Sequence, residues 1–261
     1  MELQAERPGE TASFYAWLLG PGTGRETSSW QPVALLFEHA VSGIHAVRPD
    51  GPPPSWVPII AVHGLDAAKE RAQAEDWRVV EFDKRCYTID DHGLWTRIVD
   101  ADHIPLDIDP DTLGNTIAEI NVPTPRETLE AYARVLDLEI IEMVDDIADY
   151  HMLLDDGVLA LGSVWYEPHA QHPIGPCWMV YFDVPDIEGT VRRAAGVGVD
   201  VAVPTMHEDF NIHAILVDPF GLPFGFCTYF DTVESQMRIR RTNGEELYFH
   251  EAVRLLVDPR D

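Results

Sequence analysis

Two carboxylates occupy matching places in this sequence, and each could carry acid–base chemistry. Glu2 and Glu119 stand at the same position of two predicted first strands, and Gln4 and Asn121 match two residues further on. A carboxylate on an apolar face has a raised pKa and can transfer a proton near neutral pH. Glu119 is the better candidate, because Glu2 is terminal and would fray. His213, predicted on a strand facing the same cavity, could form an acid–base pair with Glu119; a core histidine with satisfied hydrogen bonds is the more common alternative.

Large aromatic residues are predicted on or beside the strands that would line the cavities. Rings with one polar handle suit planar, partly apolar ligands. The candidate ligand-binding residues are therefore Trp56, Trp95, Trp165, Trp178, Tyr181, Tyr132, Phe14 and Asn121. The alternative is that each tryptophan simply fills the core of a curved sheet.

The clearest structural pattern runs from Gly175 to Phe230 and predicts a β–α–β–β–β unit. An aromatic and β-branched run predicts the first strand at Trp178–Val184. Asp186 is the expected N-cap of a helix that ends at the glycines of 196–198. Three more strands are expected at 199–203, 213–217 and 223–228, with Asp218–Gly221 forming the turn between the last two.

The same unit occurs earlier in the chain. A strand is expected at Trp56–Val62 and a helix at Leu65–Ala74, followed by strands at 77–82, 94–99 and 104–108. A shift of 122 residues lays Trp56 on Trp178, and a shift of 118 lays Asp100 on Asp218. The chain is therefore a duplication in which each half contains two smaller units, and this repeat decides the architecture.

The quoted residues resemble a known superfamily. The patterns W-x-V-Y-F-x-V-x-D-I from Trp178, A-A-x-x-G from Ala194 and V-D-P-F-G-x-x-F from Val217 are similar to the vicinal oxygen chelate superfamily. This group includes glyoxalase I, bleomycin-resistance proteins, fosfomycin-resistance enzymes and extradiol dioxygenases. The predicted helix with Phe14-Tyr15-x-x-Leu18-Leu19-Gly20 resembles that of its two-domain actinobacterial members.

The resemblance covers residues 2–230 and implies an α+β fold. Four βαβββ modules would pair into two domains, each a curved mixed sheet around a cavity. We expect a first domain at 1–110, a second at 111–230 and a C-terminal extension at 231–261. In the extension, strands at 237–241 and 246–256 are expected around an Asn-Gly turn, with a helix as the alternative for the last segment.

The resemblance also implies where a metal would bind, namely at the heads of first strands and at a carboxylate near the end of last strands. Those places hold Trp56, Trp178, Ile117 and Gly225, and Asp107 alone keeps a carboxylate. We therefore expect no metal cofactor. The alternative is one divalent metal (Fe, Zn or Mn) at Asp107 with His45, or with His63, His103 or Glu2.

Composition limits the class of partner. The formal charge of −27 argues against nucleic acid and anionic membranes. Cys86, Cys177 and Cys227 lack metal or disulfide spacing, and the first ten residues lack the apolar core of a signal peptide. We expect a cytoplasmic monomer or homodimer with a small-molecule ligand.

Two functional hypotheses remain. The first is a metal-free binding protein that holds an aromatic or polycyclic natural product or antibiotic, for resistance, sequestration or an auxiliary role in secondary metabolism. The second is a lyase, isomerase, cyclase or hydrolase of the same fold. It would use Glu119 and His213, or a metal at Asp107.

Overall fold

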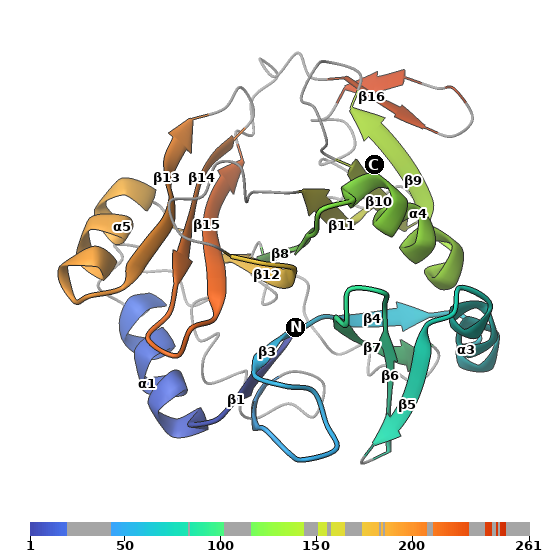
Figure 1. Ribbon diagram of the computed structural model, residues 1–261. Coiled ribbons are helices and arrows are strands. Elements are labelled where there is room, and N and C mark those ends of the chain that lie inside the picture. Colours follow the sequence, from blue (N-terminus) through green and yellow to red (C-terminus); the bar gives the residue numbers. More distant parts are fainter. Residues whose placement is uncertain are drawn as a thin grey trace.

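The computed structural model has the expected α+β architecture, with curved mixed sheets and few helices (Figure 1). It describes residues 1–19, 43–82, 84–101, 116–143, 151–155, 158–164, 174–182, 184, 186–207, 211–229, 238–241, 244 and 246–248. The predicted domain boundary at 110/111 lies outside these residues and stays a prediction.

The second half of the chain forms one sheet from two β–α–β–β–β units. The first unit comprises β8 (Thr116–Asn121), α4 (Pro125–Leu136), β9 (Glu139–Met143), β10 (His151–Asp155) and β11 (Val158–Val164). The second comprises β12 (Cys177–Phe182), α5 (Ile187–Gly196), β13 (Asp200–His207), β14 (Asn211–Val217) and β15 (Pro223–Tyr229). Antiparallel pairing of β12 with β8 joins the units in the order β13-β14-β15-β12-β8-β11-β10-β9.

The outermost strands of this sheet have special features. β16 (Arg238–Arg241) pairs antiparallel with β9 and with β17 (Glu246–Tyr248), so the predicted C-terminal hairpin is confirmed as far as Tyr248. At the other end, β13 contains Pro204, and its pairing with β14 shifts register between Val201 and Met206. Proline cannot donate to a ladder, so it is tolerated in a strand that has a neighbour on one side only.

Helix α5 begins where its sequence requires. The Asp186 carboxylate accepts a hydrogen bond of 2.8 Å from the backbone N–H of Gly189, which confirms the predicted N-cap. Beyond the helix, Gly198 has a φ of 89°, a left-handed conformation that glycine adopts without a steric penalty.

The first half repeats this arrangement with a broken strand. It contains β1 (Glu2–Ala5), α1 (Pro8–Leu19), β2 (Gly43–Ala46), β3 (Ser55–Val57), β4 (Ile59–Val62), α3 (Leu65–Ala74), β5 (Arg78–Phe82), β6 (Arg85–Ile89) and β7 (Trp95–Asp100). The predicted strand Trp56–Val62 is divided at Pro58, which has no N–H to donate. Because of this break, β3 belongs to the sheet β2-β1-β3 and β4 to the sheet β4-β7-β6-β5.

The strand assignment after α3 is corrected by the structure. The sequence analysis predicted strands at 94–99 and 104–108 as the last two of the unit, but β6 and β7 follow β5 in the sheet, and residues 104–108 lie outside the described part. The turn between β6 and β7 runs from Asp90 to Leu94, and its backbone bonds repeat those from Asp218 to Leu222. The two halves therefore match here at a shift of 128 residues, rather than at the predicted 118.

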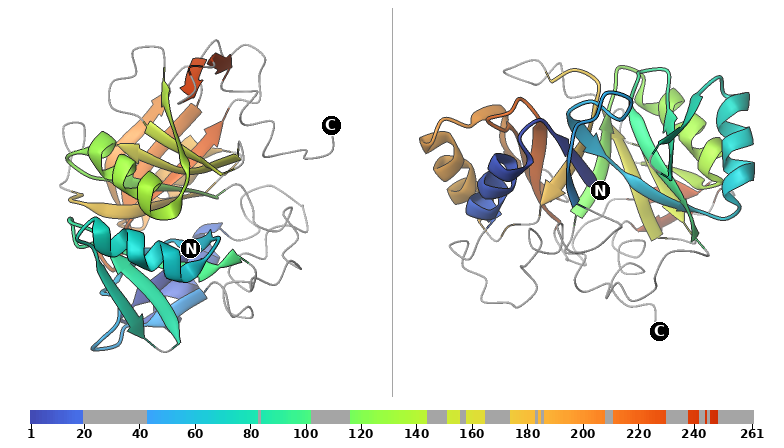
Figure 2. Two further views of the ribbon diagram at one scale, coloured as in Figure 1. Left: turned by 90° about the vertical axis from the view of Figure 1, so that its right-hand side faces the viewer. Right: turned by 90° about the horizontal axis from the view of Figure 1, so that it is seen from below.

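The two halves share one hydrophobic core. It includes Leu3 and Leu18 of the first half together with Ile120, Leu129 and Phe224 of the second. The two halves lie one against the other, with α1 beside α5 at one end and α3 beside α4 at the other (Figure 2). Between α3 and α4, the side chain of Arg71 donates a hydrogen bond of 2.9 Å to the carbonyl of Val135.

Two tyrosines cross between the halves inside this core. The Tyr15 hydroxyl on α1 donates to the carboxyl of Asp218 at 3.1 Å, and the Tyr132 hydroxyl on α4 donates to that of Asp90 at 3.0 Å. Burial raises the pKa of both tyrosines well above the ordinary value, with the facing aspartate adding to the rise. Both phenols therefore stay protonated and donate. The second oxygen of each aspartate accepts two backbone N–H bonds within its own turn.

We expect Tyr15→Phe and Tyr132→Phe each to lower the free energy of unfolding by about 2 kcal/mol, because each leaves a buried carboxyl without its donor. Urea denaturation measures this. Ser13→Ala is the control, since it removes an exposed hydroxyl from α1 and should cost less than about 0.5 kcal/mol. Equal costs for the three variants would contradict the role of the pairs.

Candidate functional site

Each half presents a sheet face that points away from the shared core. Alternate residues of a strand point to opposite faces, so the residues between those of the core lie on this other side. We call the first distal face the side chains of Glu2, Gln4, His45, Arg85, Tyr87, Trp95 and Arg97. The second distal face comprises Glu119, Asn121, Cys177, Met179, Tyr181, His213 and Cys227.

Most of the predicted ligand-binding aromatics lie in the shared core instead. Trp56 and Trp178 are buried there, with edge-on contacts to Tyr15 at 5.5 Å and to Tyr132 at 5.4 Å. Phe14 packs on this core through Tyr15. The resemblance had set both tryptophans at metal-ligand positions, but they point away from the distal faces, so side chains there could not reach a metal site on those faces.

Two of the predicted aromatics do lie on distal faces. Trp95 contacts the ring of Tyr87 edge-on at 5.6 Å on the first, and Tyr181 is buried on the second. Trp165 lies outside the described residues. The ligand-binding roles themselves stay predictions.

The second distal face holds the predicted acid–base residues in an apolar setting. Glu119 and His213 are both buried there, and Asn121 donates a hydrogen bond of 2.6 Å to the carbonyl of Gly175. Burial raises the pKa of Cys177 to about 12, and the nearby charge of Glu119 adds to the rise. Burial lowers the pKa of His213 to about 4, so its imidazole is neutral at physiological pH.

The structure does not bring Glu119 and His213 together as a direct pair. Glu119 lies on β8 and His213 on β14, and both β12 and β15 run between them. Neighbouring strands are about 4.8 Å apart, so three steps across the sheet separate the two side chains. They could act only on opposite sides of a bound molecule.

Tyr181 occupies the place next to Gly225 on this face. A β-carbon added at Gly225 would come within 2.3 Å of the Tyr181 ring, so no side chain fits there unless the ring moves. Gly225 is the residue at which the resemblance would require a metal-binding carboxylate. The tyrosine ring therefore fills the space that such a carboxylate would need.

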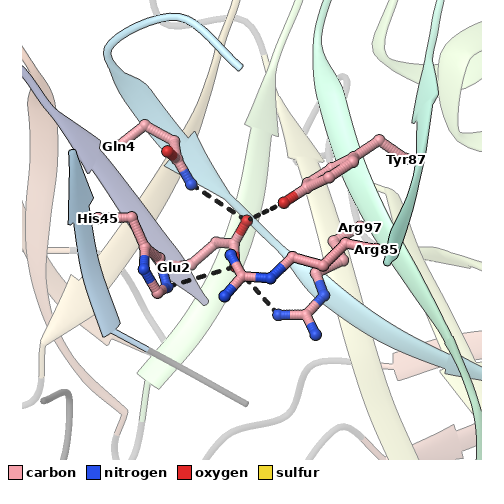
Figure 3. A network of polar contacts seen from close by, with 6 residues as sticks. All are labelled: Glu2, Gln4, His45, Arg85, Tyr87 and Arg97. Atoms are coloured by element: carbon pink, nitrogen blue, oxygen red, sulfur yellow. Dashed lines mark hydrogen bonds and ion pairs between the residues drawn. The ribbon is translucent and has the colours of Figure 1, made fainter. Parts of the chain in front are cut away.

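The first distal face carries a polar network around Glu2, which is fully buried (Figure 3). One carboxylate oxygen accepts hydrogen bonds from Gln4 at 3.1 Å and from the Tyr87 hydroxyl at 3.0 Å. The other faces Arg97 at 3.1 Å and Arg85 at 3.5 Å.

His45 completes this network, with its Nε2 at 3.7 Å from the same oxygen. Burial lowers the pKa of His45, and Arg85, Arg97 and Arg48 lower it further against the opposing charge of Glu2. The imidazole is therefore neutral at physiological pH, and the two guanidiniums balance the buried carboxylate.

Sequence reasoning singled out His45 and Glu2 but missed Arg85, Tyr87 and Arg97. The available signal was the repeated turn, since Asp90-x-x-Gly93 matches Asp218-x-x-Gly221 at a shift of 128 residues. That shift lays Arg97 on Gly225 and Arg85 on His213. The two faces thus share their glutamates but differ at the positions that surround them.

Comparison with known proteins settles the family. Residues 112–226 match the model of the Glyoxalase/Bleomycin resistance protein/Dioxygenase superfamily. The predicted superfamily is confirmed. The glyoxalase-like chain is 26% identical over 247 residues to CFP32 of Mycobacterium bovis, provisionally named a glyoxylase, which covers 86% of this chain and 91% of that protein. The Mycobacterium tuberculosis protein of the same name matches equally well.

Solved structures share the glyoxalase-like fold. Catechol 2,3-dioxygenase aligns over 87% of this chain and 85% of its own, with a TM-score of 0.50 and 14% identity. A variant of homoprotocatechuate 2,3-dioxygenase from Brevibacterium fuscum aligns over 87% of this chain and 69% of its own, with a TM-score of 0.50 and 15% identity. Both therefore resemble this chain in architecture.

A superfamily metal does not fit the described residues. Tyr181 fills the carboxylate place of the second half, and at the matching place of the first half Arg97 brings a cation that would repel a metal. Within the described ranges, no three His, Cys, Asp or Glu side chains gather as a metal site would need. Asp107, the predicted alternative ligand, lies outside these ranges and stays a prediction.

The buried imidazole of His213 makes the stability of the protein depend on pH. Its folded-state pKa of about 4 lies below the ordinary 6.5, so the unfolded chain binds the proton more readily between these values. We expect about 3 kcal/mol of the free energy of unfolding to be lost as pH falls through this window. His213→Gln should remove that dependence in urea denaturation, whereas the control His207→Gln changes an exposed side chain and should retain it. An unchanged pH profile in His213→Gln would contradict the expectation.

Proposed function

We propose that this protein binds a small organic molecule and does so without a metal at the superfamily's ligand positions. The ligand would be an aromatic or polycyclic natural product or antibiotic. The role would be resistance, sequestration or an auxiliary step of secondary metabolism, inside the cytoplasm. The Tyr181 ring against Gly225 carries this proposal, because it leaves no room for the carboxylate that a metal would require.

The chemistry of the distal faces supports binding of an organic ligand. Trp95 and Tyr87 offer aromatic surface on the first face. Met179, Cys227 and the Tyr181 ring make the second face largely apolar. No helix within the described ranges has the length and apolar character needed to cross a bilayer.

Metal content and bound mass test this proposal directly. The chain is incubated with Zn²⁺, Mn²⁺ or Fe²⁺, desalted and measured by elemental analysis and native mass spectrometry. We expect no stoichiometric metal, and an organic mass excess in freshly purified protein that denaturation releases. One metal per chain that is lost in Asp107→Asn and His45→Gln, but kept in the exposed control His207→Gln, would overturn the metal-free proposal.

An enzyme of the same fold is the second candidate. The observation that favours it is the buried Glu119 carboxylate beside the Cys177 thiol, on the face that also holds a neutral His213. A neutral imidazole can accept a proton, and a carboxylate in such a setting can transfer one. The reaction would be of lyase, isomerase, cyclase or hydrolase type, and the glyoxylase name of the mycobacterial relatives belongs to this alternative.

Glu119→Gln separates the two candidates once a ligand has been released and identified. A binding protein should keep its affinity within about threefold, because the amide preserves the shape of the carboxylate. An enzyme should lose turnover by about a hundredfold or more with little change in binding. Binding is measured by calorimetry and conversion by chromatography. The exposed control is Glu188→Gln, which should change neither quantity.

A further inference from the structure

We propose that the Glu2 network of the first distal face is an anion subsite that takes the carboxylate of a planar organic acid. This deepens the proposed function, on which it rests, by naming the class of ligand. Side chains from three strands converge there on one oxygen of Glu2: His45 from β2, Arg85 from β6 and Arg97 from β7. Their arrangement is visible in Figure 3.

The charge of the network favours an anion. Two guanidiniums, which stay ionised, face one carboxylate, so these three groups carry a net charge of 2 − 1 = +1. Arg48 adds a further positive potential, since its charge also acts on His45. This concentration of positive charge occurs in a chain whose formal charge is −27.

The network is ordered from the inside outwards. The exposed fraction of the side chain is 0% for Glu2, 11% for Arg97, 23% for Arg85 and 31% for His45. A ligand therefore meets His45 and Arg85 first, while Glu2 holds both guanidiniums from behind. Because the planar arginine fork can serve two acceptors, a ligand carboxylate can bind the cations that Glu2 has already oriented.

Aromatic surface lies directly beside these cations. Trp95 and Arg97 are two residues apart on β7 and share the same face, and Tyr87 pairs with Arg97 across the β6–β7 ladder. The Trp95 and Tyr87 rings meet edge-on at 5.6 Å. A planar ring against Trp95 would place its own carboxylate near the guanidiniums.

The second half provides an internal contrast. The positions that match Arg97 and Arg85 there hold Gly225 and His213, although Glu119 and Asn121 match Glu2 and Gln4. A buried imidazole of low pKa gives no charge to an anion. The subsite therefore belongs to the first half alone.

Calorimetry with two matched probes tests the proposal on the full chain. The probes are 2-naphthoate and the neutral 2-naphthalenemethanol, which present the same ring with and without a carboxylate. We expect the native protein to bind the acid about tenfold or more tightly than the alcohol, with an affinity that weakens as salt rises. Equal affinities, or no binding of the acid, would overturn the subsite.

Three variants locate the effect. Arg85→Gln should weaken binding of naphthoate about tenfold and leave the alcohol unchanged, while the control Arg78→Gln removes an exposed positive charge from β5 and should change neither. Glu2→Gln should strengthen binding of naphthoate, because it removes the competing carboxylate; general damage to the fold would weaken it. Thermal melting confirms that each variant is folded, and the comparison of the two probes on the native protein stands without any variant.

The outcomes separate this proposal from the function on which it rests. If naphthoate shows no preference over the alcohol, or Arg85→Gln and Arg78→Gln behave alike, the anion subsite is wrong. A metal-free organic ligand found by mass spectrometry would still support the proposed function in that case. If a stoichiometric metal is found instead, the proposed function fails, whatever naphthoate does.

Discussion

A tyrosine hydroxyl bound to a buried aspartate holds each half of the protein to the other. One oxygen of the aspartate organises its own hairpin turn, and the other receives the phenol from a helix of the opposite half. The same contact therefore fixes a turn, a helix and the interface at once. Because a buried carboxyl without partners is costly, the turn and the helix must form together.

This crosswise contact decides which sheet faces remain for a ligand. The tyrosine rings and their tryptophan neighbours fill the space between the two sheets. The faces that carry Glu2 and Glu119 then point away from each other. Duplication has kept a glutamate on both, but arginines surround the first, and a glycine and a histidine stand at the matching places around the second. One inherited fold thus offers two chemically different surfaces.

The sequence allowed much of the fold to be predicted, because local signals were strong. Helix α3 begins and ends at the predicted Leu65 and Ala74, and Asp186 caps α5 as expected. β6 was missed because its charged first residue and the turn Asp90–Leu94, which lacks the Pro-Phe of its counterpart, hid the repeat. The wrong shift of 118 residues then took Asp107, rather than Arg97, as the match of Gly225.

The candidate site was harder to predict for a different reason. Trp56 and Trp178 were correctly matched as a repeat, yet a strand pattern does not say which of its two faces lines a cavity and which meets a core. The contact of Tyr15 with Asp218 joins residues 203 positions apart, and no local spacing encodes it. Glu2 was set aside as terminal, although pairing of β1 with β2 and β3 buries it completely.

The outermost strands of the large sheet bear on how copies of this chain meet. An unpaired strand edge is a template for another chain, and many proteins protect it. Here β16 covers the edge of β9 and passes it to β17, which is three residues long. At the other end, Pro204 and the shifted register interrupt the ladder that β13 could offer. Among the described strands, these ends are poorly suited to edge-to-edge growth, which protects a wide sheet from aggregation.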